Sequence, residues 1–457
     1  MKWCNLLSTN RINCINDAKS TDISDYYLDY NYISLSRMVR AMQDKSFIYP
    51  VKTNTMVRTQ YSCGVETTAF ARLVASKAFN LLSKDDRSDI PDEVTRTHIC
   101  ELISCAGMVK DVGCPPFGKI GQTAIKEWFR TNLKKIKFKG NTVHDLLNDH
   151  MLDDLYEFTG SRRSLRRIVK YNENNMHLTF SVLGALINVR DKDAQNCCFY
   201  SERDLVRLIE EETHIIKLNH PLSLILEAAS YVVKITSAIE DASEADNLIC
   251  RRILSILRSE ENFDEKTESG EYQKFASVVK YLSSCYSELK SDPFVQSESS
   301  IVHRWIACVR NEMSDFIAYC FCTNYDEIME GKYNGFLIDN SWCRIFKNSF
   351  DSIEKKLLVS SEKFIGIEFK ISRIIDFLLE SFIKAVVNYD TDDYHNSAYK
   401  NLIRVIPERY IRLYEKESSD KSETEKLYLR IMMIVDYICD MTDTQAESMY
   451  KHVNGII

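Results

Sequence analysis

Apolar residues recur every three to four positions through most of the chain. In one early segment, Leu35, Met38, Val39 and Met42 are apolar and most residues between them are polar. This spacing places the apolar side chains on one face of a helix. Residues 46–51 are the main exception and suggest a short extended piece. With only 13 Gly and 7 Pro in the chain, few breaks are expected. The sequence predicts an all-α fold with at most a short hairpin.

A sharp elbow interrupts the helical pattern near the middle of residues 101–129. The apolar run ELISCAGMVKDV is followed by GCPPFG at 113–118. Proline removes a backbone donor and restricts the residue before it, while glycine takes backbone angles that other residues avoid. We therefore expect one helix to stop at the elbow and a second helix to begin at about Gln122.

The length and composition suit a large globular body. The chain has 457 residues, of which 45% are hydrophobic and 27% are charged, so a sizeable core is possible. We find no run of about 18 apolar residues that would predict a membrane span. The start of the chain also lacks the long apolar region of a signal peptide. These features predict a cytoplasmic protein without a membrane partner.

Charge and cysteine usage limit the candidate chemistry. A net charge of -7 gives no general attraction to nucleic acid. The 15 cysteines are scattered without a C-x-x-C pair, which predicts reduced thiols rather than a zinc site. Two basic tracts could still follow a phosphate backbone, although a solvated charged face is the alternative. They contain Lys134, Lys135, Lys137 and Lys139, and Arg162, Arg166 and Arg167.

Four segments resemble the HD-domain deoxynucleoside triphosphate triphosphohydrolases, specifically the bacterial dGTPase group. They are KDVGCPPFGK at 110–119, VRTQYSCGVE at 57–66, EAASYVVK at 227–234 and DYICDMTD at 436–443. The resemblance runs from about residue 33 to 452. It implies an all-α HD-type fold, with a leader at 1–34, a degenerate HD domain at 35–245 and a helical insertion and C-terminal region at 246–457. The leader is expected to be irregular.

The resemblance also implies where a metal would bind in an active relative. Such a site uses two His and two Asp, and the matching positions here are Cys63, Lys110, Asp111 and Ser230. A protonated ammonium has no lone pair and brings a positive charge. Three of the four ligands differ, so no metal cofactor is expected, although the family uses a divalent ion such as Mg²⁺ or Mn²⁺. Asp111 is expected to pair with Lys110 or another base.

The segment LYEFTGSRR at 155–163 resembles the family's His-Phe-Glu-Gly-Asn-x-Gln. There the His and Glu serve the attacking water and the departing phosphate. Glu157 and Thr159 occupy those two positions here, and only Phe158 and Gly160 are kept. No catalytic residue is therefore expected to be intact.

A pocket that retains positive charge could bind a nucleotide without hydrolysing it. In the family, the residue matching Gln43 reaches the sugar hydroxyl. The alternative is that the lysines neutralise Asp111 and fill the old cavity. The residues predicted to form the nucleotide pocket are Gln43, Gln60, Lys110, Lys119, Arg163 and Lys234.

Three functions remain open from the sequence. The first is a pseudoenzyme that binds a nucleotide or serves as a regulatory or partner subunit, in a homo-oligomer such as the family's hexamer or with an active paralogue. The second is an active enzyme that converts dGTP to deoxyguanosine and triphosphate at an atypical metal site on Cys63 and Asp111. The third is binding of single-stranded nucleic acid through the basic tracts.

Overall fold

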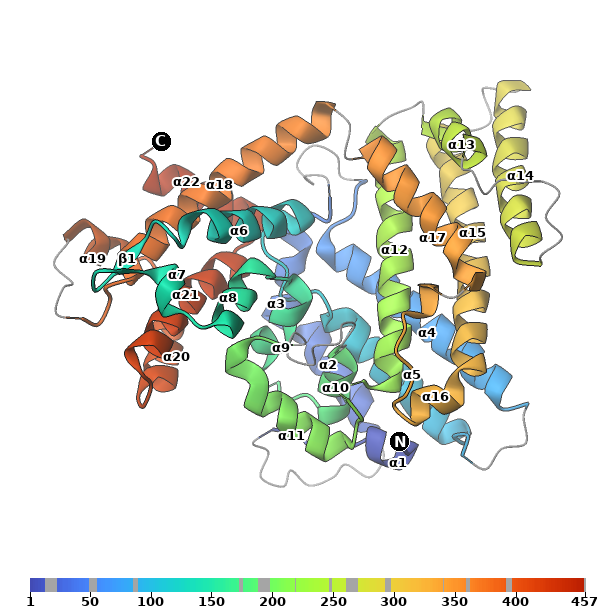
Figure 1. Ribbon diagram of the computed structural model, residues 1–457. Coiled ribbons are helices and arrows are strands. Elements are labelled where there is room, and N and C mark those ends of the chain that lie inside the picture. Colours follow the sequence, from blue (N-terminus) through green and yellow to red (C-terminus); the bar gives the residue numbers. More distant parts are fainter. Residues whose placement is uncertain are drawn as a thin grey trace.

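The structure is a computed structural model (Figure 1). It describes residues 1–12, 23–48, 56–84, 89–171, 176–187, 198–217, 219–245, 249–259, 270–291, 297–339, 341–358, 362–391 and 397–455. These residues form helices and one antiparallel hairpin, which confirms the predicted all-α fold. The hairpin pairs β1 (Lys137–Phe138) with β2 (Asn141–Thr142). Its turn places Lys139 and Gly140 at positive φ, as tight hairpin turns require.

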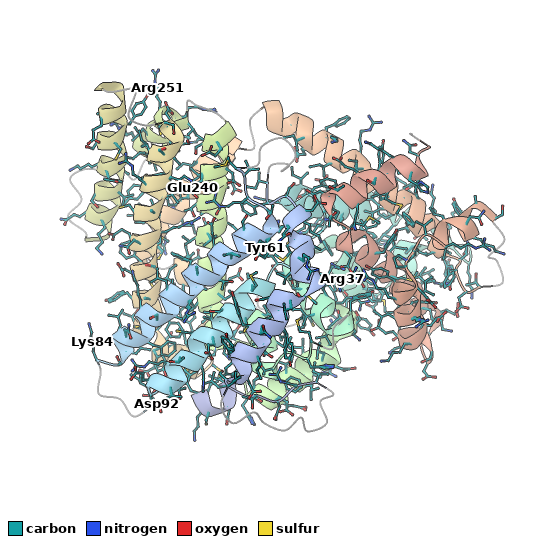
Figure 2. All side chains as sticks on the ribbon, turned by 180° about the vertical axis from the view of Figure 1, so that it is seen from behind. Arg37, Tyr61, Lys84, Asp92, Glu240 and Arg251 are labelled. Carbon is teal, nitrogen blue, oxygen red and sulfur yellow. The ribbon has the colours of Figure 1, made fainter. Side chains whose placement is uncertain are left out.

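The centre of the fold is a group of four long helices. They are α4 (Gln60–Leu82), α5 (Glu93–Val109), α12 (Pro221–Ala245) and α15 (Glu298–Thr323), and α4 packs against the other three. Figure 2 shows α4 running from near Tyr61 toward Lys84 beside α5, which begins after Asp92. Small buried residues, among them Ala71 and Ala75, let the helix backbones approach closely. Helices α4, α5 and α15 each begin with a side-chain cap, as with Asp92 accepting from the Thr95 amide.

Two further groups of helices lie in different parts of the molecule (Figure 1). One group, next to α12 and α15, consists of α13 (Ile249–Ser259), α14 (Gly270–Ser291), α16 (Tyr325–Met329) and α17 (Ser341–Ile353). The other consists of α6 (Gly118–Asn132), α18 (Glu362–Val386), α19 (Ser397–Ile403), α20 (Glu408–Ser418), α21 (Glu423–Asp440) and α22 (Asp443–Val453). The predicted C-terminal region, 246–457, is thus divided between both groups.

Shorter elements connect these groups. The helices are α3 (Arg37–Ala41), α7 (Val143–Leu146), α8 (Asp149–Tyr156), α9 (Gly160–Lys170), α10 (Phe180–Leu186) and α11 (Arg203–Thr213). Three 3₁₀ turns lie at Met42–Asp44, Tyr200–Glu202 and Leu337–Asp339, and a π-helical turn lies at Glu354–Leu358. The extended piece expected at 46–51 is an isolated bridge between Ser46 and Thr59, and its residues from 49 onward lie outside the described residues.

The prediction of an irregular leader is wrong for its described part. Helices α1 (Trp3–Leu6) and α2 (Asp25–Leu35) lie within it, and α2 packs on α5. Tyr26, Asp29 and Ile33 are buried at helical spacing. Asp29 accepts a hydrogen bond from the Thr179 amide at 3.0 Å and pairs with Arg11. The buried face of α2 includes this carboxylate, so the apolar pattern alone did not show it.

Helix α12 is long and apolar enough, over Pro221–Glu244, to cross a membrane by length and composition. No other helix in the described part of the chain meets that test. Most of this window is buried inside the protein, against α4, α5 and α15. The sequence prediction passed over the window because charged residues such as Glu227 and Lys234 interrupt its apolar run. Helix α12 is therefore a core helix of this fold.

A buried network of charges joins α9 to α21. The Asp436 carboxylate lies 3.0 Å from Arg163 Nε and 2.7 Å from Arg166 Nε. Asp440 lies 2.6 Å from Arg163 Nη2 and 2.8 Å from Arg167 Nε. All five side chains are almost fully buried. Buried charges are stable only when they are paired and hydrogen-bonded, so this network fixes the position of α21 relative to α9.

We expect Asp436→Asn to lower the free energy of unfolding by about 3 to 5 kcal/mol, because it removes the counter-charge that the buried Arg163 and Arg166 share. Urea unfolding measures the loss. The matched control is Asp204→Asn, since Asp204 pairs with Arg207 in full solvent and should change stability by less than about 1 kcal/mol. Equal losses in both variants would contradict a structural role for the network.

Candidate functional site

The elbow at 113–118 positions the end of α5 against α9. A Cβ on Gly113 would lie 2.4 Å from the Gly160 carbonyl oxygen, so only glycine fits there. Phe117 and Gly118 take positive φ angles of 63° and 55°, which a non-glycine residue rarely adopts. Helix α6 consequently begins at Gly118, four residues before the predicted start at Gln122.

Two buried charged residues hold the elbow from outside. Asp443 accepts hydrogen bonds from the Phe117 amide at 2.7 Å and the Ser46 amide at 2.9 Å. Lys45 Nζ donates to the carbonyl oxygens of Cys114 and Cys439, each at 2.6 Å. Burial lowers the pKa of Lys45 to about 8, because a low-dielectric surrounding disfavours the charged form.

Asp111 follows directly after α5 and is almost fully buried. Its partner is Lys234 on α12, whose Nζ lies 2.9 Å from Oδ1 and 2.8 Å from Oδ2. Burial alone would raise the pKa of Asp111, but the ammonium groups of Lys234 and Lys110 outweigh burial and hold that pKa below its ordinary value. The carboxylate is therefore ionised, and one cation contacts both of its oxygens.

Lys110 forms an ion pair with a second carboxylate, which lies on α12. Its Nζ lies 2.7 Å from Glu227 Oε2 on α12, and the Lys110 side chain is only 8% exposed. Glu227 was not among the predicted site residues. A signal was present in the sequence, because Glu227 and Lys234 are seven residues apart and so lie on one face of α12.

Two thiols, those of Cys63 and Cys114, lie near the Asp111–Lys234 ion pair. Burial raises the pKa of Cys63 to about 12 and that of Cys114 to about 12, and the neighbouring Lys234 lowers both only in part. Cys114 Sγ lies 3.9 Å from Asp111 Oδ1. Both thiols are therefore neutral near pH 7. Ser230, one turn before Lys234 on α12, is also buried.

The residues present do not fit a divalent metal. Metal ligands must be deprotonated, yet Cys63 stays a thiol, Lys110 is a cation in an ion pair and Lys234 contacts both oxygens of Asp111. Across the ranges that the structure describes, no group of three or more His, Cys, Asp or Glu side chains is placed to hold a metal ion. The structure brings Asp111, Lys110 and Cys63 together around the ammonium group of Lys234.

The predicted nucleotide pocket is only partly assembled. Lys119 is 67% exposed and pairs with Glu354 at 2.8 Å. Gln60 is buried and donates to the Ser46 carbonyl at 3.2 Å, whereas Gln43 is exposed. The inclusion of Arg163 is corrected by the structure, because its guanidinium is fully buried in the network with α21. A phosphate cannot reach it there.

Glu157 and Thr159, the positions that match the family's water-handling residues, have other contacts. Glu157 is half exposed and pairs with Arg130 and, at 3.5 Å, with Lys126. Thr159 is the N-cap of α9, and its hydroxyl accepts a hydrogen bond from the Arg162 amide at 3.2 Å. Both side chains therefore stabilise local structure, and the hydroxyl of Thr159 has no basicity to offer a water molecule.

The two basic tracts differ in their surroundings. Lys134, Lys135, Lys137 and Lys139 are exposed around the hairpin. The second tract is not a surface, which corrects the prediction for Arg162, Arg166 and Arg167. Arg166 and Arg167 are buried in the network with α21, and Arg162 pairs with Asp154 at 2.8 Å. Their carboxylate partners lie on other helices, and so the local sequence did not reveal them.

Proteins of known description match the chain over nearly its whole length. A deoxyguanosinetriphosphate triphosphohydrolase-like protein from Listeria monocytogenes is 30% identical to the chain, over 100% of both sequences. One with the same description from Listeria innocua is also 30% identical over 100% of both. A probable deoxyguanosinetriphosphate triphosphohydrolase from Pseudomonas aeruginosa is 23% identical, covering 96% of this chain and 95% of its own. No protein-family model matches the chain.

These full-length similarities show that the chain belongs to the deoxyguanosinetriphosphate triphosphohydrolase-like family. The family resemblance inferred from the elbow and the three other segments is thereby confirmed.

We expect Lys234→Met to lower the free energy of unfolding by about 3 kcal/mol, because Asp111 would remain buried without its cation. The double variant Asp111→Asn with Lys234→Met should recover most of that loss. Urea unfolding of the two single variants and the double variant gives the coupling energy. Lys119→Met is the control, since its pair with Glu354 is exposed. Additive losses would contradict the ion pair.

Lys45 provides a prediction about pH. Because its folded pKa of about 8 lies below the ordinary lysine value, the unfolded chain binds more protons between pH 8 and about 10.4. The wild type should therefore gain stability relative to Lys45→Met over that interval, by at most roughly 3 kcal/mol. Urea unfolding at several pH values measures the difference. Lys137→Met, at an exposed site, should show no such trend. A constant offset for Lys45→Met would refute the expectation.

Proposed function

We propose that this protein is a catalytically inactive member of its family and acts as a regulatory or partner subunit of an oligomer. The contact of Lys234 with both oxygens of Asp111 carries the proposal. A divalent ion lowers the pKa of bound water and polarises a phosphate. The Lys234 ammonium neutralises the same carboxylate but has no vacant orbital for a water or phosphate oxygen.

The surroundings of the site support the same proposal. Phosphoryl transfer requires a positioned nucleophile and counter-charges for the developing negative charge. Glu157 lies in a half-exposed ion pair with Arg130, and Thr159 caps α9. The positions that would handle water thus contribute to packing. The proposal accordingly assigns this chain no hydrolytic step.

The cations of the predicted pocket favour a role through protein contacts over one through a bound nucleotide. Lys110, Lys119, Arg163 and Lys234 each lie within 3.0 Å of a carboxylate oxygen. A nucleotide phosphate would have to displace these carboxylates. This supports the alternative in which the basic residues fill and neutralise the old cavity.

An exposed apolar pair on α18 offers a surface for such contacts. Ile365 and Phe369 lie one helical turn apart and are 55% and 65% exposed. Between them, Gly366 has no atom within 4 Å of its ideal Cβ position, so a partner helix could approach closely. Apolar surface of this kind becomes stable when a partner covers it.

Hydrolysis and metal content test the loss of catalysis together. We expect the purified protein to release no deoxyguanosine from dGTP with Mg²⁺ or Mn²⁺, and elemental analysis to find far less than one metal ion per chain. The variant Cys63→His, Lys110→His, Ser230→Asp, Lys234→Tyr restores the ligand types of the family and should take up about one Mn²⁺ per chain. Lys234→Tyr alone is its control and should take up none.

A wild-type protein that holds one metal ion per chain and hydrolyses dGTP would overturn the proposal. That outcome would favour the active enzyme with an atypical site on Cys63 and Asp111.

Native mass spectrometry tests the assembly. We expect an oligomer of this chain, or a mixed one when an active family member is co-expressed, and we expect Phe369→Asp to reduce it. Val94→Asp is the control, because Val94 is similarly exposed, at 64%, on the separate helix α5. A monomer in both preparations would contradict the assignment as an oligomer subunit.

A further inference from the structure

A basic cleft lies between the hairpin and α18, apart from the central site. Figure 1 places β1 and α19 at one edge of the molecule, away from α12 with Lys234. The cleft has a volume of about 360 Å³, within the usual range for small-molecule sites. Three lysines, one carboxylate and other polar side chains are part of its lining. They include Lys135, Lys137, Lys384, Glu380, Asn388 and Tyr399.

The cleft has more positive than negative charge within it. Glu380 pairs with Lys384, one turn later on α18. Lys135 Nζ donates to Asn132 Oδ1 at 3.2 Å, which is a neutral partner. For Lys137, no ion pair or hydrogen bond to its ammonium exists among the described residues. Two ammonium groups therefore face the cleft without a matching carboxylate.

A third cation, Arg430, contacts residues that adjoin the lining of the cleft. Arg430 on α21 is 1% exposed, its guanidinium lies 5.0 Å from the Phe138 ring centroid, and Nη1 donates to the Tyr389 carbonyl. Its Nε and Nη2 have no hydrogen-bond partner within the described ranges. Phe138 and Tyr389 each follow a lining residue, Lys137 and Asn388. Burial lowers the pKa of Arg430, and nearby negative charges, among them Glu423 and Asp390, offset this effect only in part. An anion in the cleft would stabilise the guanidinium further.

We propose that this cleft binds the phosphate groups of a polyphosphate-bearing ligand. Lys135 and Lys137 contact the anion as point charges, which suits the several oxygens of a phosphate chain. Asn388 offers amide donors, and Arg430 acts from behind through its field, which low-dielectric surroundings transmit well. The source of the phosphates is free polyphosphate or the backbone of a single strand. The inference does not rest on the function proposed above.

Calorimetric titration with sodium tripolyphosphate, without divalent metal, tests the cleft. We expect binding that weakens as salt is raised, and a loss of affinity of about tenfold or more in Lys137→Glu, as for removing one charged hydrogen bond. The matched control is Lys134→Glu, which changes the same charge on the same exposed tract but does not line the cleft. It should bind as the wild type does. Absence of binding, or equal losses in both variants, would overturn the proposal.

Two further variants separate this cleft from the central site and from a purely structural role. Lys234→Met should leave tripolyphosphate binding unchanged, and a loss there with retention in Lys137→Glu would place the anion at Asp111 and refute the cleft. Arg430→Met should weaken binding without lowering the free energy of unfolding, because burial disfavours the charge that the substitution removes. A large loss of stability with unchanged affinity would eliminate Arg430 from the site.

Titration with an oligothymidylate identifies the source of the phosphates. If the strand competes with tripolyphosphate and Lys137→Glu weakens its binding, the phosphates are those of a nucleic-acid backbone. Tripolyphosphate binding that the strand does not displace identifies free polyphosphate. A strand that binds equally well to wild type and Lys137→Glu, while tripolyphosphate does not bind, contradicts the cleft.

Discussion

The ion pair of Lys234 with Asp111 is the interaction around which the centre of this protein is built. A carboxylate between α5 and α12 must be neutralised where it lies, because a buried charge without a partner is strongly unfavourable. A tethered ammonium meets that requirement permanently, since it is part of the chain. The four central helices can therefore pack without an ion being recruited, and the neutral thiol of Cys63 is accommodated beside the pair.

The same constraint extends from the centre to the C-terminal helices. Arg163 and Arg166 on α9 would be unfavourable in the interior on their own, and Asp436 on α21 makes their burial possible. The segment that resembles a catalytic stretch of the family therefore anchors the C-terminal helices. Thr159 in that segment is a helix cap, so these positions contribute to packing.

Two cations that contact no carboxylate among the described residues lie away from this centre. Lys137 and Arg430 are near the hairpin, and the exposed apolar pair of α18 is nearer the other end of that helix. At the central site, by contrast, Lys110 and Lys234 each pair with a carboxylate, so that site offers little to a ligand. The protein's contacts with other molecules are more favourable at the periphery, where positive charge and apolar surface remain available.

The sequence by itself determined the helical fold, the elbow and the family, because helical periodicity and the Gly-Pro-Pro-Phe-Gly run are local patterns. It also indicated that Asp111 needs a base. Only the tertiary structure decided that Lys234, 123 residues away, contacts both oxygens of Asp111. It likewise showed that the basic tract at 162–167 is buried, because Asp436 lies 273 residues from Arg163. A local sequence pattern shows which charged residues are present, but the packing of helices that are distant in the sequence decides which of these residues form ion pairs.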